Sequence, residues 1–169
     1  MPMALPFDTV VAISDDGDHC SGIVTIESEG FGRVEIDPRA DPTQTVAWAR
    51  HLAGVVSLLG REGIPAGGWR ATIASLSSSA ALEVAAITGL LARADTSWMP
   101  IGIARLGQRV ENEVVGLPSG IMDQFISAGA VEGHASLMDC RALTLTPEPL
   151  PRGVVIAIMD TGTRRRLAE

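Results

Sequence analysis

The sequence contains no lysine and no tyrosine, and all 13 of its basic residues are arginine. A P-loop kinase needs a lysine on the transferred phosphates, and a Schiff-base or pyridoxal enzyme needs a lysine amine, so both classes are excluded. The 20 acidic residues give a net charge of -7. This balance argues against nucleic acid as a partner, because binding to phosphates relies on clustered Lys and Arg.

Cysteine and histidine are also scarce. Cys20 and Cys140 form no CxxC pair, and the three histidines lack ligand spacing, so we expect neither a disulfide framework nor a zinc site. No apolar run reaches membrane-spanning length, and the N-terminus lacks the charged start and long apolar stretch of a signal peptide. We therefore expect a cytoplasmic protein with no membrane partner.

The 169 residues, 46% of them hydrophobic, are enough for one core and predict a single domain. Short β-rich pieces and longer stretches of helical spacing predict an α+β domain, a mixed β-sheet covered by helices. We expect strands over 9–13, 22–26, 33–36, 69–74, 135–138, 142–145 and 154–159. We expect helices over 42–60, 76–94 and from Pro100 to Val114, and one that Ser119 caps.

A serine cluster opens the predicted helix at 76–94. The first N–H groups of a helix have no partner within it, and together with the helix dipole they favour an anion such as phosphate. Small side chains allow the phosphate to approach the backbone, and a serine hydroxyl can reach bound Mg²⁺. Serine is also an ordinary N-cap and alanine an ordinary helix former. This segment alone therefore does not decide between the two interpretations.

The segment 111–125 holds two carboxylates. If Ser119 caps a helix, Asp123 lies in its first turn, where the dipole favours negative charge. An aspartate with a pKa of about 3.9 is ionised at neutral pH and can accept a proton or hold a substrate hydroxyl. Glu111 and a serine would suffice to hold Mg²⁺ beside ATP phosphates. Carboxylates near helix ends are also common capping groups, so each signal is weak alone.

Together, these segments resemble the galactokinase branch of the GHMP small-molecule kinases. Residues 76–85 look like the phosphate-binding motif of the family, and residues 116–127 are similar to its active-site segment. The Met-Asp-Gln-Phe block at 122–125 is the most specific part. The similarity continues through 133–135, 138–141 and 160–168, and so covers nearly the whole chain.

This resemblance implies the fold of the GHMP kinase N-terminal domain (ribosomal protein S5 domain 2-like). It also implies transfer of the γ-phosphoryl group of MgATP to the C1 hydroxyl of galactose or a related sugar. Asp123 would be the base or hydroxyl-orienting carboxylate, Gly120 would contact the sugar, and Ser79 and Glu111 would serve Mg²⁺. The phosphates of ATP would lie on Leu76, Ser77, Ser78, Ser79, Ala80 and Ala81.

Three parts of the family pattern are not found. The Gly-Arg-x-Asn and Gly-Glu-His-Thr-Asp segments do not precede Leu5, residues 71–75 lack the expected glycines, and no C-terminal domain follows Glu169. We therefore expect residues 1–169 to be a single partial N-terminal domain, a fragment that is weak or inactive alone. We also expect the apolar face left by the missing domain to favour self-association.

Other functions stay open at this stage. The chain could be a non-catalytic regulatory protein that binds galactose or ATP, or a fragment without function. Retention of Asp123 and of the serines at 77–79 speaks mildly against the regulatory protein, and a chain that binds neither galactose nor ATP would favour the fragment. Another GHMP substrate, such as mevalonate or homoserine, is disfavoured by the block at 122–125 and its continuation at 139–141.

Overall fold

Within residues 1–5, 8–15, 22–74, 78–159 and 162, which the computed structural model describes, four strands form one mixed sheet in the order β1-β4-β2-β3. β1 pairs antiparallel with β4, β4 pairs parallel with β2, and β2 pairs antiparallel with β3. The strands are β1 (Val10–Asp15), β2 (Val24–Ser28), β3 (Gly32–Ile36) and β4 (Trp69–Ala74).

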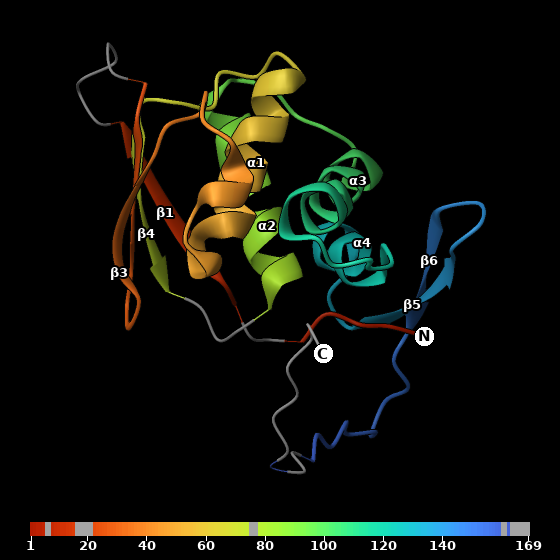
Figure 1. Cartoon of the computed structure of the whole chain (residues 1–169). Helices are drawn as coiled ribbons and strands as arrows, with labels where there is room; N and C mark the ends of the chain where they lie inside the picture. Colours follow the sequence, from red (N-terminus) through yellow and green to blue (C-terminus); the bar gives the residue numbers. More distant parts are fainter. Residues whose placement is uncertain (6–7, 16–21, 75–77, 160–161, 163–169) are drawn as a thin grey trace.

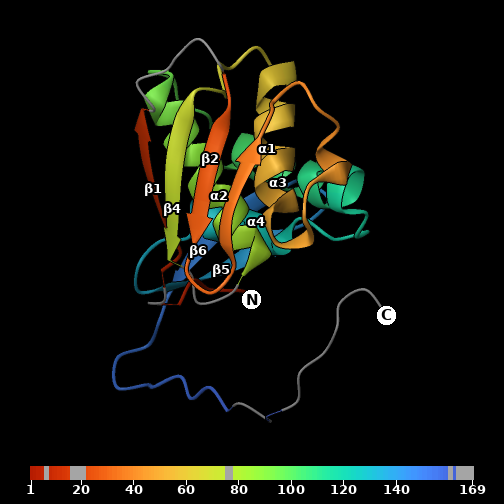
Figure 2. The ribbon, with the colours of Figure 1, turned by 60° about the vertical axis from the view of Figure 1, so that its left-hand side comes forward.

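Helices cover one face of this sheet, as the two views of the ribbon show (Figures 1 and 2). They are α1 (Arg50–Arg61), α2 (Ser79–Arg93), α3 (Pro100–Arg109), the π-helix η3 (Val110–Val115) and α4 (Met122–Gly129). Strands β5 (His134–Asp139) and β6 (Thr144–Pro149) form a separate hairpin. The predicted α+β fold, with a mixed sheet under helices, is confirmed. No helix in the described residues is long and apolar enough to cross a membrane.

The alternation of side chains in β4 explains why only one face of the sheet is covered. Trp69, Ala71 and Ile73 are buried, whereas Arg70 and Thr72 between them are exposed. Successive residues of a strand point to opposite faces, so the apolar set lies under the helices and the polar set faces outward.

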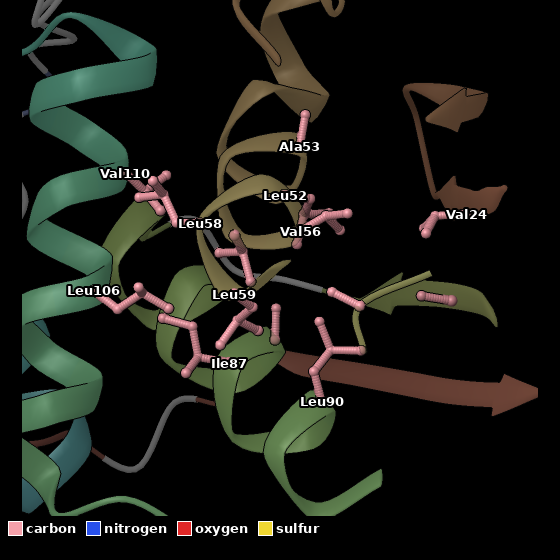
Figure 3. Close-up of a cluster of buried hydrophobic side chains, with 14 of the residues drawn as sticks. Val24, Leu52, Ala53, Val56, Leu58, Leu59, Ile87, Leu90, Leu106 and Val110 are labelled. Atoms are coloured by element: carbon pink, nitrogen blue, oxygen red, sulfur yellow. The ribbon is translucent and has the colours of Figure 1, made fainter. Parts of the chain in front are cut away.

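The core fills the space between the sheet and the helices, and α1 and α2 supply most of it (Figure 3). The three- and four-residue spacing of apolar positions in α1 directs them to one side, as predicted. The core residues labelled in Figure 3 include Val24, Leu52, Val56, Leu59, Ile87, Leu90, Leu106 and Val110. This packing holds α2 against α1 and α3, and so fixes the place at which α2 begins.

The predicted helix over 42–60 starts too early. Residues 42–49 instead form two short 3-10 turns, η1 (Pro42–Gln44) and η2 (Ala47–Ala49), and α1 follows at Arg50. The side chain of Asp41 accepts hydrogen bonds from the backbone N–H and the hydroxyl of Thr43, which closes the first turn locally. Thr45 is then extended, with a φ of -68° and a ψ of 148°, and this conformation interrupts any continuous helix.

Two predictions near the C-terminal end are also corrected. The strand predicted at 142–145 belongs partly to a turn, because Leu143 adopts a positive φ of 54°, and β6 begins only at Thr144. The strand predicted at 154–159 is not formed. That segment runs away from the domain (Figure 2) and its side chains are exposed. A strand needs a neighbour for its backbone hydrogen bonds, and none of the described strands lies beside it.

Two glycines of α1 predict opposite responses to the same substitution. A Cβ added at Gly54 would lie 2.7 Å from Cγ1 of Val110, whereas a Cβ at Gly60 would meet nothing within 4 Å. We expect Gly54→Ala to lower the free energy of unfolding by about 1–3 kcal/mol through overpacking. We expect Gly60→Ala to raise it by about 0.5–1 kcal/mol through helix propensity. Urea unfolding of the two variants measures both, and a stabilised Gly54→Ala would contradict the close packing of α1 on η3.

Candidate functional site

The serine cluster forms the N-terminus of α2. Ser78 is the N-cap, and its hydroxyl accepts a hydrogen bond from the backbone N–H of Ala81 at 3.4 Å. Ser79 is the first helical residue, and Ala80 behind it is buried. Ser78 therefore has the capping role that serines commonly have at this position. Leu76 and Ser77, the other predicted phosphate contacts, lie outside the described residues.

Ser79 has a different partner. Its hydroxyl donates a hydrogen bond of 2.8 Å to Oε1 of Glu111, which is 32 residues further along the chain and only 6% exposed. The structure thus brings together the two residues that were predicted to serve Mg²⁺. A hydroxyl and a carboxylate are hard oxygen donors of the kind that Mg²⁺ prefers, so the pair fits this ion.

The π-helix η3 places Glu111 on the inner side of the helical layer. The backbone N–H groups of Gly116 and Leu117 both donate to the carbonyl oxygen of Glu111, each at 2.9 Å. Gly116 ends the element in the left-handed conformation, with a φ of 83°, which glycine adopts without a steric penalty. Single π-helical turns inside α-helices are frequent at functional sites. The sequence predicted only a helix that stops at Gly116.

Ser119 does not cap α4, which corrects the prediction. Its backbone N–H donates to Oδ1 of Asn112 at 2.9 Å, and its carbonyl oxygen accepts from Nε2 of Gln108 at 3.2 Å. These contacts tie the loop at 116–121 to α3 and η3. The helix starts later, with Ile121 as an N-cap that makes no side-chain hydrogen bond.

Asp123 nevertheless lies in the first turn of α4, as predicted, and its side chain is exposed. Gly120 lies in the loop just before, and a Cβ added there would meet nothing within 4 Å. An exposed carboxylate in the first turn of a helix is accessible to a substrate, which a base or a hydroxyl-orienting group requires. The roles of both residues stay predictions.

A second buried carboxylate, Glu83, lies one turn after Ser79 on α2 and is completely buried. Its Oε1 is 2.7 Å from Nδ1 of His51, and its Oε2 accepts from Nε2 of Gln124 at 3.2 Å. Burial raises the pKa of the Glu83 carboxyl above its ordinary value, the hydrogen bond to His51 opposes this, and the neighbouring charge of Glu111 adds to it.

Atoms of His51, Glu83 and Glu111 that could bind a metal lie within 4.8 Å of one another. The sequence analysis missed His51 and Glu83, because the spacing of histidines along the chain does not reveal contacts between helices. One signal was available for Glu83. Glu83 is a charged residue within an otherwise apolar stretch of the sequence, between Leu82 and Val84.

Comparison with known proteins gives the family to which the helical part of the chain is similar. Residues 53–130, which include most of α1 and all of β4, α2, α3, η3 and α4, match the family model described as the GHMP kinases N terminal domain. The chain carries a GHMP kinase N-terminal domain. The galactokinase of Chloroflexus aggregans is 35% identical over 174 residues, and the match covers 99% of this chain and 44% of that protein. The chain thus spans less than half the length of this curated relative.

Solved structures show the same fold. The galactokinase of Lactococcus lactis, solved in complex with galactose, matches with a TM-score of 0.77 at 22% identity, over 94% of this chain and 46% of that one. The mevalonate kinase of Methanococcus jannaschii matches with a TM-score of 0.62 at 19% identity, over 74% of this chain and 43% of that one. The similarity in fold to these structures therefore extends beyond residues 53–130.

The contact between Gln124 and Glu83 predicts a measurable effect on stability. Gln124→Met keeps the volume of the side chain but removes the donor, and it leaves a buried carboxylate oxygen without that partner. We expect the free energy of unfolding to fall by about 1–3 kcal/mol. Replacing both partners, in Glu83→Met with Gln124→Met, removes the unpaired carboxylate oxygen but also the contact of Glu83 with His51. Stability is therefore expected to recover part of the loss.

Urea unfolding of the single and double variants measures these changes. A single variant as stable as the unsubstituted chain would show that the hydrogen bond contributes nothing.

Proposed function

We propose that this domain takes part in the transfer of the γ-phosphoryl group of MgATP to the C1 hydroxyl of galactose or a related small sugar. The observation that carries the proposal is the hydrogen bond between Ser79 and Glu111. It places a buried carboxylate beside the N-terminus of α2, where a phosphate group is favoured by the helix dipole and the first-turn amides. The 35% identity to a galactokinase supports the sugar as acceptor.

One group of residues in the site would bind MgATP, and another would bind the sugar. The backbone at Ser79, Ala80 and Ala81 would hold phosphate oxygens, and Ser79 with Glu111 would hold Mg²⁺. When bound, Mg²⁺ supplies positive charge that offsets the negative charge of the phosphates. Gly120, which carries no side chain and borders open space, leaves room for the sugar.

Asp123 would act on the acceptor. The oxygen of the sugar hydroxyl forms a bond to the γ-phosphorus, the bond from that phosphorus to the bridging oxygen of ADP breaks, and the hydroxyl proton passes to the carboxylate of Asp123. Positioning and charge stabilisation dominate catalysis of such transfers. A domain without lysine can therefore contribute to this reaction.

We expect turnover of the 169-residue chain by itself to be weak or undetectable. The chain covers less than half of its curated relative, and residues 71–75 before α2 contain no glycine to wrap the phosphates. Sugar-dependent ADP release with MgATP is the measurement, with galactose, mevalonate and homoserine compared as acceptors. Phosphorylation of mevalonate or homoserine in place of galactose would refute the proposed acceptor. Tight binding of galactose without turnover would support a regulatory role.

Any turnover is expected to depend on Asp123. Asp123→Ala and the isosteric Asp123→Asn should each lower kcat by about two to four orders of magnitude, as loss of a general base does. Because Asp123 is exposed and in the first turn of a short helix, we expect both variants to keep their fold and their affinity for MgATP. Equal turnover in Asp123→Asn and the unsubstituted chain would remove Asp123 from the reaction.

The metal assignment is tested by two glutamates of the same π-helix. Glu111→Gln should weaken binding of MgATP by about tenfold or more, while binding of ATP without Mg²⁺ changes little. Glu113→Gln is the matched control, because the Glu113 side chain is exposed and pairs with Arg109 and Arg61 at the surface. Calorimetric titration with and without Mg²⁺ gives both affinities. An equal effect of the two substitutions would contradict a metal role for Glu111.

A further inference from the structure

Glu83 lies where helices from distant parts of the chain meet. Its two oxygens contact His51 of α1 and Gln124 of α4, at 2.7 and 3.2 Å, and its side chain is fully enclosed. Gln124 is also buried, with 1% of its surface exposed. A carboxylate on α2 thus joins the first and last helices of the layer.

A glycine of α3 makes room for this pair. A Cβ added at Gly107 would lie 2.9 Å from Cγ of Gln124 and 3.2 Å from Oε2 of Glu83. Both distances are shorter than ordinary van der Waals contact, so α3 approaches the pair as closely as a residue without a side chain permits. The packing of four helices therefore accommodates the contact between Glu83 and Gln124.

Stability does not explain a carboxylate in this position. Burial of a charge costs free energy, and apolar residues of similar volume often serve a fold equally well. A hydrogen bond differs from an apolar contact in one respect, because it requires a particular direction as well as proximity. The contact from Glu83 can therefore fix an orientation that apolar packing leaves free to rotate.

Among the helices that meet at Glu83, α4 has the fewest local interactions to hold its orientation. It has only eight residues and no side-chain cap at its N-terminus, and isolated helices of that length are not stable. Its apolar side, with Ile121 and Phe125, packs against the β5–β6 hairpin region and Ala104 of α3. The polar contact of Gln124 is made on α2 instead, so it restrains the rotation of α4 from a second direction.

Gln124 directly follows Asp123. Successive residues of a helix differ by about 100° around its axis, so the direction of the Gln124 side chain determines the direction of the Asp123 side chain. We propose that Glu83 is a positioning residue that fixes the rotation of α4 through Gln124 and thereby the direction in which Asp123 points. The consequence for catalysis rests on the proposed function, whereas the effect on α4 does not.

Replacing both partners separates positioning from stability. The variant Glu83→Met with Gln124→Met contains no unpaired carboxylate and has side chains of similar volume, and His51 at the start of α1 is the group that loses a partner. We expect the backbone amide of Phe125, which donates to the carbonyl oxygen of Ile121 in α4, to exchange its hydrogen about tenfold faster or more in this variant. Amides in the middle of α1 are expected to exchange as in the unsubstituted chain.

Two further variants of the 169-residue chain serve as controls. Ile87→Val removes one methylene from the fully buried apolar side of the same helix, and we expect no specific change at Phe125. The reversed pair, Glu83→Gln with Gln124→Glu, again contains one carboxylate and one amide, and we expect it to restore slow exchange. An unchanged exchange rate in the double methionine variant, or equal acceleration by Ile87→Val, would overturn the proposal.

The functional readout is kept separate from the exchange measurement. If the chain turns over, the double methionine variant should lower kcat while KM for MgATP stays within about twofold, because the phosphate contacts at α2 are untouched. A rise in KM at constant kcat would overturn the positioning role. If the unsubstituted chain neither binds MgATP nor turns over, the proposed function fails, and the exchange rates still decide whether Glu83 fixes α4.

Discussion

Two carboxylates inside a layer of apolar helices, those of Glu83 and Glu111, constrain how these helices can be arranged. Each must be contacted by polar groups, because an isolated buried charge costs several kcal/mol. The partners come from three different helices: His51 from α1, Ser79 from α2 and Gln124 from α4. None of these helices can slide or rotate far without leaving a buried oxygen unpaired. Apolar contacts alone would set no such limit.

The sequence predicts best the elements whose signals lie within them. The alternation in β4 gives its bounds of 69–74, and the serines before α2 mark its start, because both depend on neighbouring residues. Predictions fail where a distant contact decides. Asn112 and Gln108 hold Ser119 away from a capping position, and the apolar segment at 154–159 forms no strand without a partner. Strand propensity does not supply that partner.

The candidate site shows the same division. Asp123 falls in the first turn of a helix whether or not Ser119 caps it, so local spacing was sufficient. The contact between Ser79 and Glu111 joins residues 32 positions apart, and only the resemblance to a family suggested it. Nothing in the local sequence indicated the π-helical turn at Val110–Val115. Within this turn, Val110 and Val114 pack closely against Gly54 of α1, and Glu111 between them contacts Ser79.

The pairing of β1 with β4 has a consequence for how the chain reaches this fold. Val10 pairs with Ala74, and β4 lies between β1 and β2 in the sheet. During synthesis from the N-terminus, the residues of β2, β3 and α1 emerge before those of β4, so β1 has to stay without its partner strand until β4 appears. Contacts between distant segments slow folding, since the intervening loop must close first. The arrival of β4, directly followed by α2, is therefore the step that assembles the sheet and lets Glu83 reach His51 of α1. Glu111 and Gln124, the partners of Ser79 and Glu83 in η3 and α4, follow only later in the chain.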